Sequence, residues 1–260
     1  MELLDIKRKN PQLSRIIKKM YKYVSLNNYI TFKLRAIKKF LKKLFFRMTK
    51  NNNIVENLLL NYEILDSGMI LENHLRIILT NLKKILDENI DGDIVELGCN
   101  AGSTSLFIQR LLNIYKSNKQ FHVYDSFEGL PEKHNEDMNN EERQYKLGDC
   151  KTKKEILINN SKLANIKLPK IHVGWFGKLP DAEYPKKIAF AFFDGDFYTS
   201  IIDSFNKVYP RMSTKSILLI HDYKWDVLPG VEKACVDFLK DKPEKESIVY
   251  NNRIGVMIKK

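Results

Sequence analysis

The chain has 260 residues, 43% hydrophobic and 29% charged, which is a normal balance for a globular protein with one sizeable domain and an appendage. Its three cysteines lie far apart without a C-x-x-C pair, which argues against a disulfide framework or a zinc knuckle and favours a reducing cytoplasm. The sequence has no run of about 18 apolar residues and no signal-peptide core, so we expect neither a membrane span nor export.

The formal net charge of +12 is concentrated at the N-terminus. Residues 1–50 hold fifteen of the 44 lysines and arginines but only two of the 32 acidic residues, which is a local balance of +13. The rest of the chain, with 29 basic and 30 acidic side chains, is almost neutral. This asymmetry predicts a basic arm over residues 1–53 that contacts something anionic, attached to a domain over residues 54–260 with a different role.

Within the arm, residues 30–47 read ITFKLRAIKKFLKKLFFR, with apolar side chains mainly on one helical face and lysines largely opposite. Such a helix is typical of an element that lies on an anionic membrane surface or docks on a partner. Packing on its own domain or on a second copy of the chain, as in a homo-oligomer, is an equal alternative. Nucleic acid is a weaker candidate, because the aromatic residues lie on the apolar face. We expect a cytoplasmic protein that can associate with the inner face of the membrane.

Helical spacing resumes between Leu58 and Leu86, and from there strands and helices alternate. Asn251-Asn252 is typical of a two-residue hairpin turn, so the last two strands should pair antiparallel. The order predicts an α/β fold, a doubly wound and mainly parallel sheet with an antiparallel C-terminal hairpin. The predicted strands are 93–97, 120–125, 170–174, 188–194, 216–221, 247–251 and 253–258, and the predicted helices lie near 103–115, 152–165, 198–208 and 230–240.

Residues 94–105, IVELGCNAGSTS, are typical of a buried strand that turns through glycines into a helix. An α/β sheet holds nucleotide-like ligands at such a turn, because the backbone can approach them closely there. The spacing G-x-x-x-G differs from the G-x-G-x-x-G of dinucleotide sites, which argues against a dehydrogenase. Glu96, at the strand end, suits a ligand that carries positive charge.

Residues 128–146 are polar, acidic and poor in periodicity. A loop of this length inside a compact domain is usually a functional lid or disordered. We favour a lid, because the preceding strand should end at the ligand-binding edge of the sheet.

Two further strand ends carry side chains suited to a nucleoside ligand. Asp125 follows the second predicted strand, where a carboxylate can accept two hydrogen bonds from a ribose diol or can cap the following turn. Trp175 follows the third predicted strand and could stack on an aromatic ring or fill the core.

Acidic side chains also end the next two predicted strands, at Asp194 and Asp222. Two carboxylates so placed could bind a hard divalent cation such as magnesium, with Asp196 and His221 beside them. The alternative is structural, with helix capping by Asp196 and a hydrogen bond from His221 to the backbone. The other four histidines show no ligand spacing, and we assign them no role.

Taken together, the segments ELGCNAGSTS, YDSFEGLP, VGWFGKLP, FDGDFY and HDY resemble the macrocin O-methyltransferase family over residues 60–258. Members of that family are magnesium-dependent sugar O-methyltransferases that use S-adenosylmethionine and have the Rossmann-like class I methyltransferase fold. The segments GWF with the following LP, and DGDFY, are more specific than the glycine loop. The basic arm lies outside the resemblance.

The resemblance implies roles for the matching positions, with Asp194 as both a metal ligand and the proton acceptor. This chain departs from the family's common D-D-Y at His221-Asp222-Tyr223, and imidazole is a softer ligand than carboxylate. The implied cofactor-binding residues are Glu96, Gly98, Asn100, Gly102, Ser103, Thr104, Asp125, Ser126, Phe127 and Trp175, and the implied metal ligands are Asp194, His221 and Asp222.

We therefore predict an enzyme that methylates a sugar hydroxyl of a glycoconjugate, either a surface polysaccharide precursor or a secondary metabolite. The basic arm favours a lipid-linked or membrane-proximal acceptor. A metal would lower the pKa of the hydroxyl and a carboxylate would accept its proton. Two alternatives stay open: an RNA-directed methyltransferase that uses the arm, and a non-catalytic protein of cofactor-binding fold that binds partners.

Overall fold

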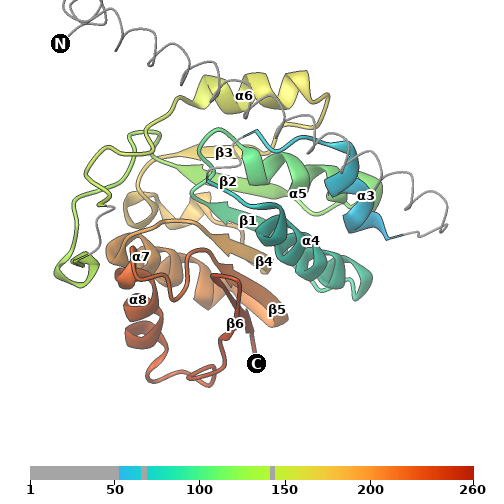
Figure 1. The fold of residues 1–260 in the computed structure, drawn as a ribbon. Coiled ribbons are helices and arrows are strands. Elements are labelled where there is room, and N and C mark those ends of the chain that lie inside the picture. The colour runs from blue at the N-terminus through green and yellow to red at the C-terminus, as the bar shows by residue number, and fades with distance from the viewer. Residues whose placement is uncertain (1–52, 66–68, 141–143) are drawn as a thin grey trace, which may run out of the picture. The chain divides into compact units, whose positions relative to one another are not determined.

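The structure, a computed structural model, describes residues 53–65, 69–140 and 144–260 (Figure 1). Residues 54–260 form one compact unit, distinct from residues 1–53. The basic helix predicted at 30–47 lies outside the described residues. In the part of the chain that is described, no helix is both long and apolar enough to cross a membrane.

Seven strands form a single sheet at the centre of this unit (Figure 1). They are β1 (Asp93–Leu97), β2 (Phe121–Asp125), β3 (Lys170–Val173), β4 (Ile188–Phe193), β5 (Met212–Ile220), β6 (Val249–Asn251) and β7 (Ile254–Ile258). The strand order is β3-β2-β1-β4-β5-β7-β6. The first five strands are parallel, and β7 runs antiparallel to both β5 and β6. The predicted doubly wound, mainly parallel sheet with a C-terminal antiparallel hairpin is confirmed.

Helices cover both faces of the sheet (Figure 1). The helices α4 (Glu72–Asp87) and α5 (Ser103–Ile114) pack with α3 (Ile54–Asn61) and with Leu157 of α6 (Lys154–Leu163) in one hydrophobic core cluster. The helices α7 (Tyr198–Val208) and α8 (Pro229–Leu239) pack in a second cluster. The prediction of helical structure throughout 58–86 was wrong between α3 and α4, where residues 62–65 and 69–71 are not helical.

The strand β5 is longer than predicted, because it begins at Met212 instead of residue 216. Its first half is polar, so the apolar pattern alone does not reveal it. Ile188 pairs with Met212 but Phe190 pairs with Ile217, so the register shifts between the two strands. A bulge of this kind admits residues that do not alternate between the sheet faces.

The strand β4 reads IAFAFF and is buried along its whole length, as expected for a central parallel strand covered on both faces. Phe190 and Phe192 belong to the core cluster formed with α4 and α5. Ala191 and Phe193 belong to the cluster formed with α7 and α8. Because a shift of one residue would exchange these two sets, the packing fixes the register of β4 and the position of the residue that follows it.

The predicted lid segment packs against the second helical layer. It contains a short 3-10 helix, η1 (Asn135–Asp137), whose Asp137 is buried. The Asp137 carboxylate accepts hydrogen bonds from the backbone N–H of Tyr198 and of His134, both at 2.8 Å. Asn139 donates to the carbonyl of Val227 at 2.7 Å. These contacts connect the segment to the N-terminal ends of α7 and α8, while its closure over a ligand stays a prediction.

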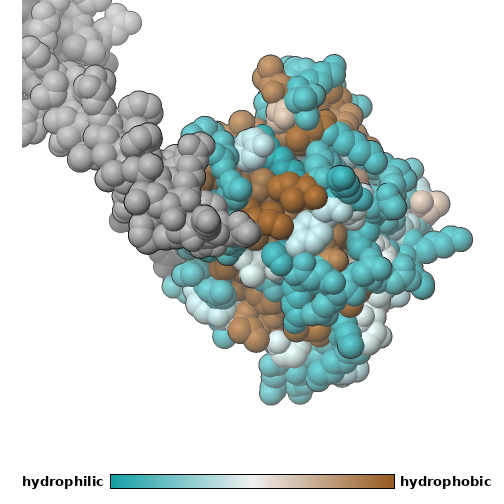
Figure 2. Space-filling model, turned by 90° about the vertical axis from the view of Figure 1, so that its right-hand side faces the viewer, coloured by the Kyte–Doolittle hydropathy of each residue, from teal (hydrophilic) through white to brown (hydrophobic). Residues whose placement is uncertain are grey.

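The surface of the unit carries scattered large hydrophobic side chains. Leu163 and Val249 are the most exposed of them, at 87% and 66%. Figure 2 shows one face, on which hydrophobic residues appear between hydrophilic ones. Isolated apolar residues are normal on protein surfaces, so we assign these two no role in docking.

The contacts of Asp137 predict how the lid segment responds when they are lost. Asp137→Ala should lower the free energy of unfolding by about 1–3 kcal/mol, because two backbone N–H groups lose a buried acceptor. Hydrogen exchange should accelerate in residues 128–140. The control is Asp149→Ala, which removes an exposed carboxylate bonded to the nearby Lys146 N–H and should cost less than about 0.5 kcal/mol. Unchanged exchange in Asp137→Ala would contradict this role.

Candidate active site

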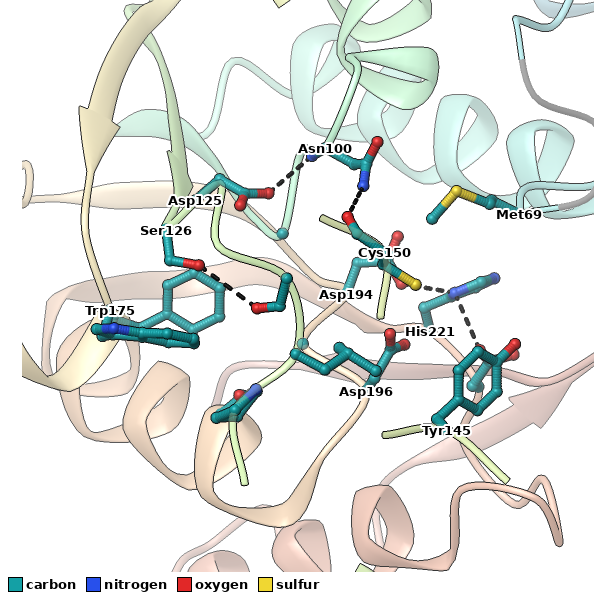
Figure 3. Close-up of a pocket in the computed structure, with 18 of the residues that line it drawn as sticks. Met69, Asn100, Asp125, Ser126, Tyr145, Cys150, Trp175, Asp194, Asp196 and His221 are labelled. Atoms are coloured by element: carbon teal, nitrogen blue, oxygen red, sulfur yellow. Dashed lines mark hydrogen bonds and ion pairs between the residues drawn. The ribbon is translucent and has the colours of Figure 1, made fainter. Parts of the chain in front are cut away.

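A cavity of about 180 Å³ opens at the carboxyl edge of the sheet, where the strand order reverses between β1 and β4. Asp125, Ser126 and Trp175 lie on one side, His221 and Tyr145 lie on the other, and Asp194 lies between them (Figure 3). The cavity brings together these predicted site residues: Gly98, Asn100, Asp125, Ser126, Trp175, Asp194, His221 and Asp222.

The glycine loop passes directly against the end of β4. A Cβ atom on Gly98 would lie 2.1 Å from the carbonyl oxygen of Asp194, and the φ of Gly98 is +95°. Both the contact and the backbone conformation therefore require glycine here. Gly102 is required for a different reason: its φ is +88° and a Cβ would lie 2.3 Å from Leu157 on α6. Gly102 thus serves the packing of α5 against α6.

Five of the predicted cofactor-binding residues do not line the cavity. Ser103 and Thr104 belong to the first turn of α5, which follows Gly102. Phe127 has a φ of +58° and its side chain is buried in the first core cluster. Glu96 is buried beneath the loop. Direct contact of these residues with a cofactor stays a prediction.

The buried carboxyl of Glu96 supports the loop from below. Ser105, on α5, donates a hydrogen bond to Glu96 Oε2 at 2.5 Å. Burial, together with the neighbouring Asp194 and Asp125, raises the pKa of Glu96 to about 8, and the Ser105 hydrogen bond acts in the opposite direction. A carboxyl group with this pKa is largely protonated at neutral pH and suits a structural hydrogen bond between strand and helix.

On the nucleoside side, backbone N–H groups hold Asp125 in place. Its Oδ2 accepts from the N–H of Asn100 at 2.8 Å, and its Oδ1 accepts from the N–H of Phe127 at 2.7 Å. Burial raises the pKa of Asp125, and these two hydrogen bonds oppose that effect. Each carboxylate oxygen has a second lone pair, so Asp125 can still accept hydrogen bonds from a ribose diol. Trp175 lines the same side and is only half-buried, which favours ring stacking over a core role.

On the opposite side, a histidine joins the two acidic strand ends. His221 Nδ1 lies 2.6 Å from Asp194 Oδ1 and 3.4 Å from Asp222 Oδ2. Arg253, in the turn of the C-terminal hairpin, has its Nε 3.7 Å from Asp222 Oδ1. Each of the two acids is therefore already next to a nitrogen donor of the chain itself.

A second histidine, His74 on α4, completes this group, and the sequence interpretation missed it. Its Nδ1 lies 3.0 Å from His221 Nε2, and the side chain is buried. His74 also forms a hydrogen bond with the backbone of Asn252. The signal in the sequence is faint: His74 continues the apolar stripe of α4 that includes Ile78 and Ile85, where a polar residue requires a buried partner.

The pKa values of the two histidines move in opposite directions. Burial lowers the pKa of His221, but Asp194, Asp222 and Asp196 outweigh it and raise the value to about 9. Burial and the neighbouring His221 lower the pKa of His74 to about 4. At neutral pH a protonated His221 therefore donates from Nδ1 to Asp194 and from Nε2 to the neutral His74.

The predicted metal site does not fit this arrangement. A metal ligand needs a lone pair directed at the metal, and both nitrogens of His221 already take part in hydrogen bonds with Asp194 and His74. Within residues 53–65, 69–140 and 144–260, no group of three or more His, Cys, Asp or Glu side chains is arranged to hold a metal ion. The geometry does not support a cation bound by Asp194, His221 and Asp222 together.

An aromatic wall beside the acids also escaped the sequence interpretation. Tyr145 and Trp225 line the cavity and meet edge to face, with 6.4 Å between ring centroids. The Arg253 guanidinium lies 4.3 Å from the centre of the Trp225 ring. Aromatic faces of this kind suit the apolar side of a sugar or a polyketide. The residues come from loops outside the quoted motifs, so their convergence could not be anticipated.

Comparison with known proteins identifies a family match that covers the whole compact unit. The profile of the family described as Macrocin-O-methyltransferase (TylF) matches residues 40–260. Among solved structures, the O-methyltransferase NovP superposes with a TM-score of 0.65 at 19% identity, covering 79% of this chain and 87% of NovP. A likeness at this identity shows a shared fold.

Two curated relatives are similar in sequence. The 8-demethyl-8-(2,3-dimethoxy-alpha-L-rhamnosyl)-tetracenomycin-C 4'-O-methyltransferase of Streptomyces olivaceus is 26% identical over 182 residues, which cover 67% of this chain and 64% of the relative. The mycinamicin III 3''-O-methyltransferase of Micromonospora griseorubida is 26% identical over 184 residues, which cover 67% of this chain and 71% of the relative. The match thus spans less than two thirds of the length of the first relative.

The raised pKa of Glu96 predicts a pH dependence of stability. In the folded protein this pKa rises from 4.5 to about 8, so the contribution of Glu96 is complete below pH 4.5 and is lost as the pH rises to about 8. Glu96→Gln removes this titration and keeps the shape. The melting temperature of the wild type, relative to that of Glu96→Gln, should fall across this pH range. Glu155→Gln, at an exposed acid, is the control, and a difference independent of pH would contradict the assignment.

Proposed function

Because the chain belongs to the macrocin O-methyltransferase family, we propose that it transfers a methyl group from S-adenosylmethionine to a sugar hydroxyl of a glycosylated acceptor. One observation carries the proposal: a single cavity has a carboxylate suited to a ribose diol, Asp125, on one side and the strand-end carboxylate Asp194 toward the other. A donor nucleoside and an acceptor hydroxyl can therefore bind together, which is the arrangement that methyl transfer needs.

The nucleoside side of the cavity would hold the methyl donor. Asp125 would accept hydrogen bonds from the ribose, and Trp175 would stack on the adenine ring. The methionine part would lie along Gly98 and Asn100, which line the cavity. S-adenosylmethionine supplies an activated methyl group attached to a positively charged sulfur.

The other side would hold and activate the acceptor. A sugar hydroxyl is a poor nucleophile at neutral pH, so a base that accepts its proton accelerates attack. Asp194 is the candidate base: its Oδ1 accepts from His221, which leaves Oδ2 as the oxygen to which we assign proton transfer. Tyr145 and Trp225 would pack against the sugar ring and exclude water.

The sequence also predicts that the enzyme depends on magnesium, and the steps above do not require this metal. The family resemblance supports a metal, whereas the hydrogen bonds of His221 oppose one. Metal dependence is therefore a separate question from methyl transfer to a sugar.

Two sources of the acceptor sugar can be distinguished. The name of one relative describes methylation of a rhamnosyl-tetracenomycin and that of the other methylation of mycinamicin III, which supports a secondary-metabolite glycoside. The basic arm supports a lipid-linked precursor of a surface polysaccharide at the inner face of the membrane. Assays of methyl incorporation from labelled donor into purified glycosides and into extracted lipid-linked glycans would separate the two.

Substitutions on the two sides of the cavity should affect different steps, turnover on one side and donor binding on the other. Asp194→Asn should lower turnover by about 10²–10⁴-fold, the usual contribution of a general base, while calorimetry shows an affinity for S-adenosylmethionine within about threefold of the wild type. Asp125→Ala should weaken that affinity by more than about tenfold, because the ribose loses its acceptor. Asp241→Asn, at an exposed acid beyond the end of α8, should leave both unchanged. Full activity in Asp194→Asn would refute the proposed base.

The arm gives a further prediction, tested in the full-length chain. Neutralising its lysines should weaken binding to vesicles that contain anionic lipid by about 1 kcal/mol per lysine at low salt. The variant carries glutamine at Lys38, Lys39, Lys42 and Lys43, and the control carries glutamine at the exposed Lys151, Lys153, Lys162 and Lys167 of the compact unit. Selective loss of RNA binding instead would favour the nucleic-acid alternative.

A further inference from the structure

The acceptor side of the cavity contains a continuous chain of hydrogen-bonded side chains from three elements. Asp194 follows β4, His221 follows β5, and His74 belongs to α4. The contacts are 2.6 Å from Asp194 Oδ1 to His221 Nδ1 and 3.0 Å from His221 Nε2 to His74 Nδ1. Both rings are buried, so water does not compete freely for these contacts.

These contacts engage both ring nitrogens of His221, whichever of them carry hydrogen. If the ring has a single N–H, that hydrogen lies on Nδ1 toward the Asp194 carboxylate, and the Nε2 lone pair accepts from His74. If both nitrogens carry hydrogen, His221 donates at both ends. In neither case is a nitrogen lone pair directed into the cavity, so His221 has no ligand position to offer a metal.

The second acid, Asp222, lies at ion-pair distance from two nitrogen groups of the chain. Asp222 has one oxygen 3.4 Å from His221 Nδ1 and the other 3.7 Å from Arg253 Nε. The Arg253 guanidinium lies over the Trp225 ring, which holds it beside the cavity. A cation between Asp194 and Asp222 would have to displace His221 from Asp194 and would lie close to the positive charge of Arg253.

We propose that this protein activates its acceptor without a divalent cation, and that His221, held by His74 and assisted by Arg253, takes the position that a metal would occupy. The inference rests on the proposed methyl transfer and deepens it. His221 is a positioning residue: its hydrogen bond to Oδ1 fixes the plane of the Asp194 carboxylate and directs Oδ2 at the acceptor. His74 positions His221 in turn.

The resulting step balances without a metal. The acceptor oxygen forms the new C–O bond with the methyl carbon, and the S–C bond of the donor breaks with its electron pair remaining on sulfur. The hydroxyl proton passes to Oδ2 of Asp194. The products are the methyl ether, S-adenosylhomocysteine and a protonated Asp194, which then releases its proton to solvent.

The first test measures metal binding directly, apart from turnover. Full-length protein is freed of metal with a chelator and titrated with Mn²⁺ in the presence of S-adenosylhomocysteine, while the electron paramagnetic resonance signal of free Mn²⁺ is recorded. The wild type should leave this signal unchanged. Stoichiometric Mn²⁺ binding by the wild type that is lost in Asp222→Asn would overturn the proposal.

A matched pair of variants tests whether His221 is what excludes the metal. His221→Asp supplies a carboxylate beside Asp194 and Asp222 and should gain Mn²⁺ binding, whereas His221→Asn, of similar size and neutral, should not. Thermal unfolding and calorimetry with S-adenosylmethionine establish that both variants are folded. A folded His221→Asp that binds the donor but no Mn²⁺ would contradict the inference.

Measurements of turnover test the proposal independently of metal binding. Removal of metal with EDTA should leave the rate within about twofold, whereas loss of a required metal would cost more than about a hundredfold. His74→Leu should lower kcat by about tenfold or more with little change in KM for the donor, and His74→Gln, whose amide can bond to His221, should restore most of it. Equal losses in both His74 variants would indicate a merely structural role. If no acceptor is methylated at all, the proposed function fails while the Mn²⁺ titration still decides this inference.

Discussion

The site depends on one structural constraint: the parallel hydrogen-bond ladder continues one residue beyond each strand end. Gly98 N donates to the carbonyl of Tyr124, Asp194 N donates to that of Leu97, and His221 N donates to that of Phe193, each at 2.8 Å. The first residues after β1, β4 and β5 are therefore held in a row across the sheet. Their positions follow from the packing of the strands, which both core clusters fix, and not from the flexibility of loops.

The same constraint crowds five carboxyl groups at one edge of the sheet, and each is accommodated differently. Burial and, after it, the neighbouring carboxylates raise the pKa values of Glu96 and Asp196, so their neutral forms are favoured. Asp125 receives two backbone N–H groups. Asp194 and Asp222 face the histidine and arginine donors described above. The acids that face hydrogen-bond and ion-pair donors therefore lie where ribose and acceptor hydroxyls would bind.

Much of the sheet could be predicted from the sequence, because β1 and β4 are short apolar runs that end in an acid. Asp125 and Asp194 follow the same logic, since carboxyl ends of parallel strands converge on one edge. The start of β5 could not be predicted, because its first half is polar and lacks the apolar pattern of a strand. Tyr145 and Trp225 could not be predicted either, since loops carry no periodicity that would show which side chains return to the cavity.

The segment before β1 shows most clearly what local patterns leave out. Helix α4 lies outside the alternation of strands and helices that defines the fold, yet it supplies His74, and Met69 just before it lines the cavity. Burying an imidazole on an apolar helix face costs free energy unless it is hydrogen bonded. The partner that offsets this cost lies 147 residues away in the sequence. A polar residue in an otherwise apolar helical stripe is therefore evidence of a distant partner, and here that partner is the residue that orients the proposed base.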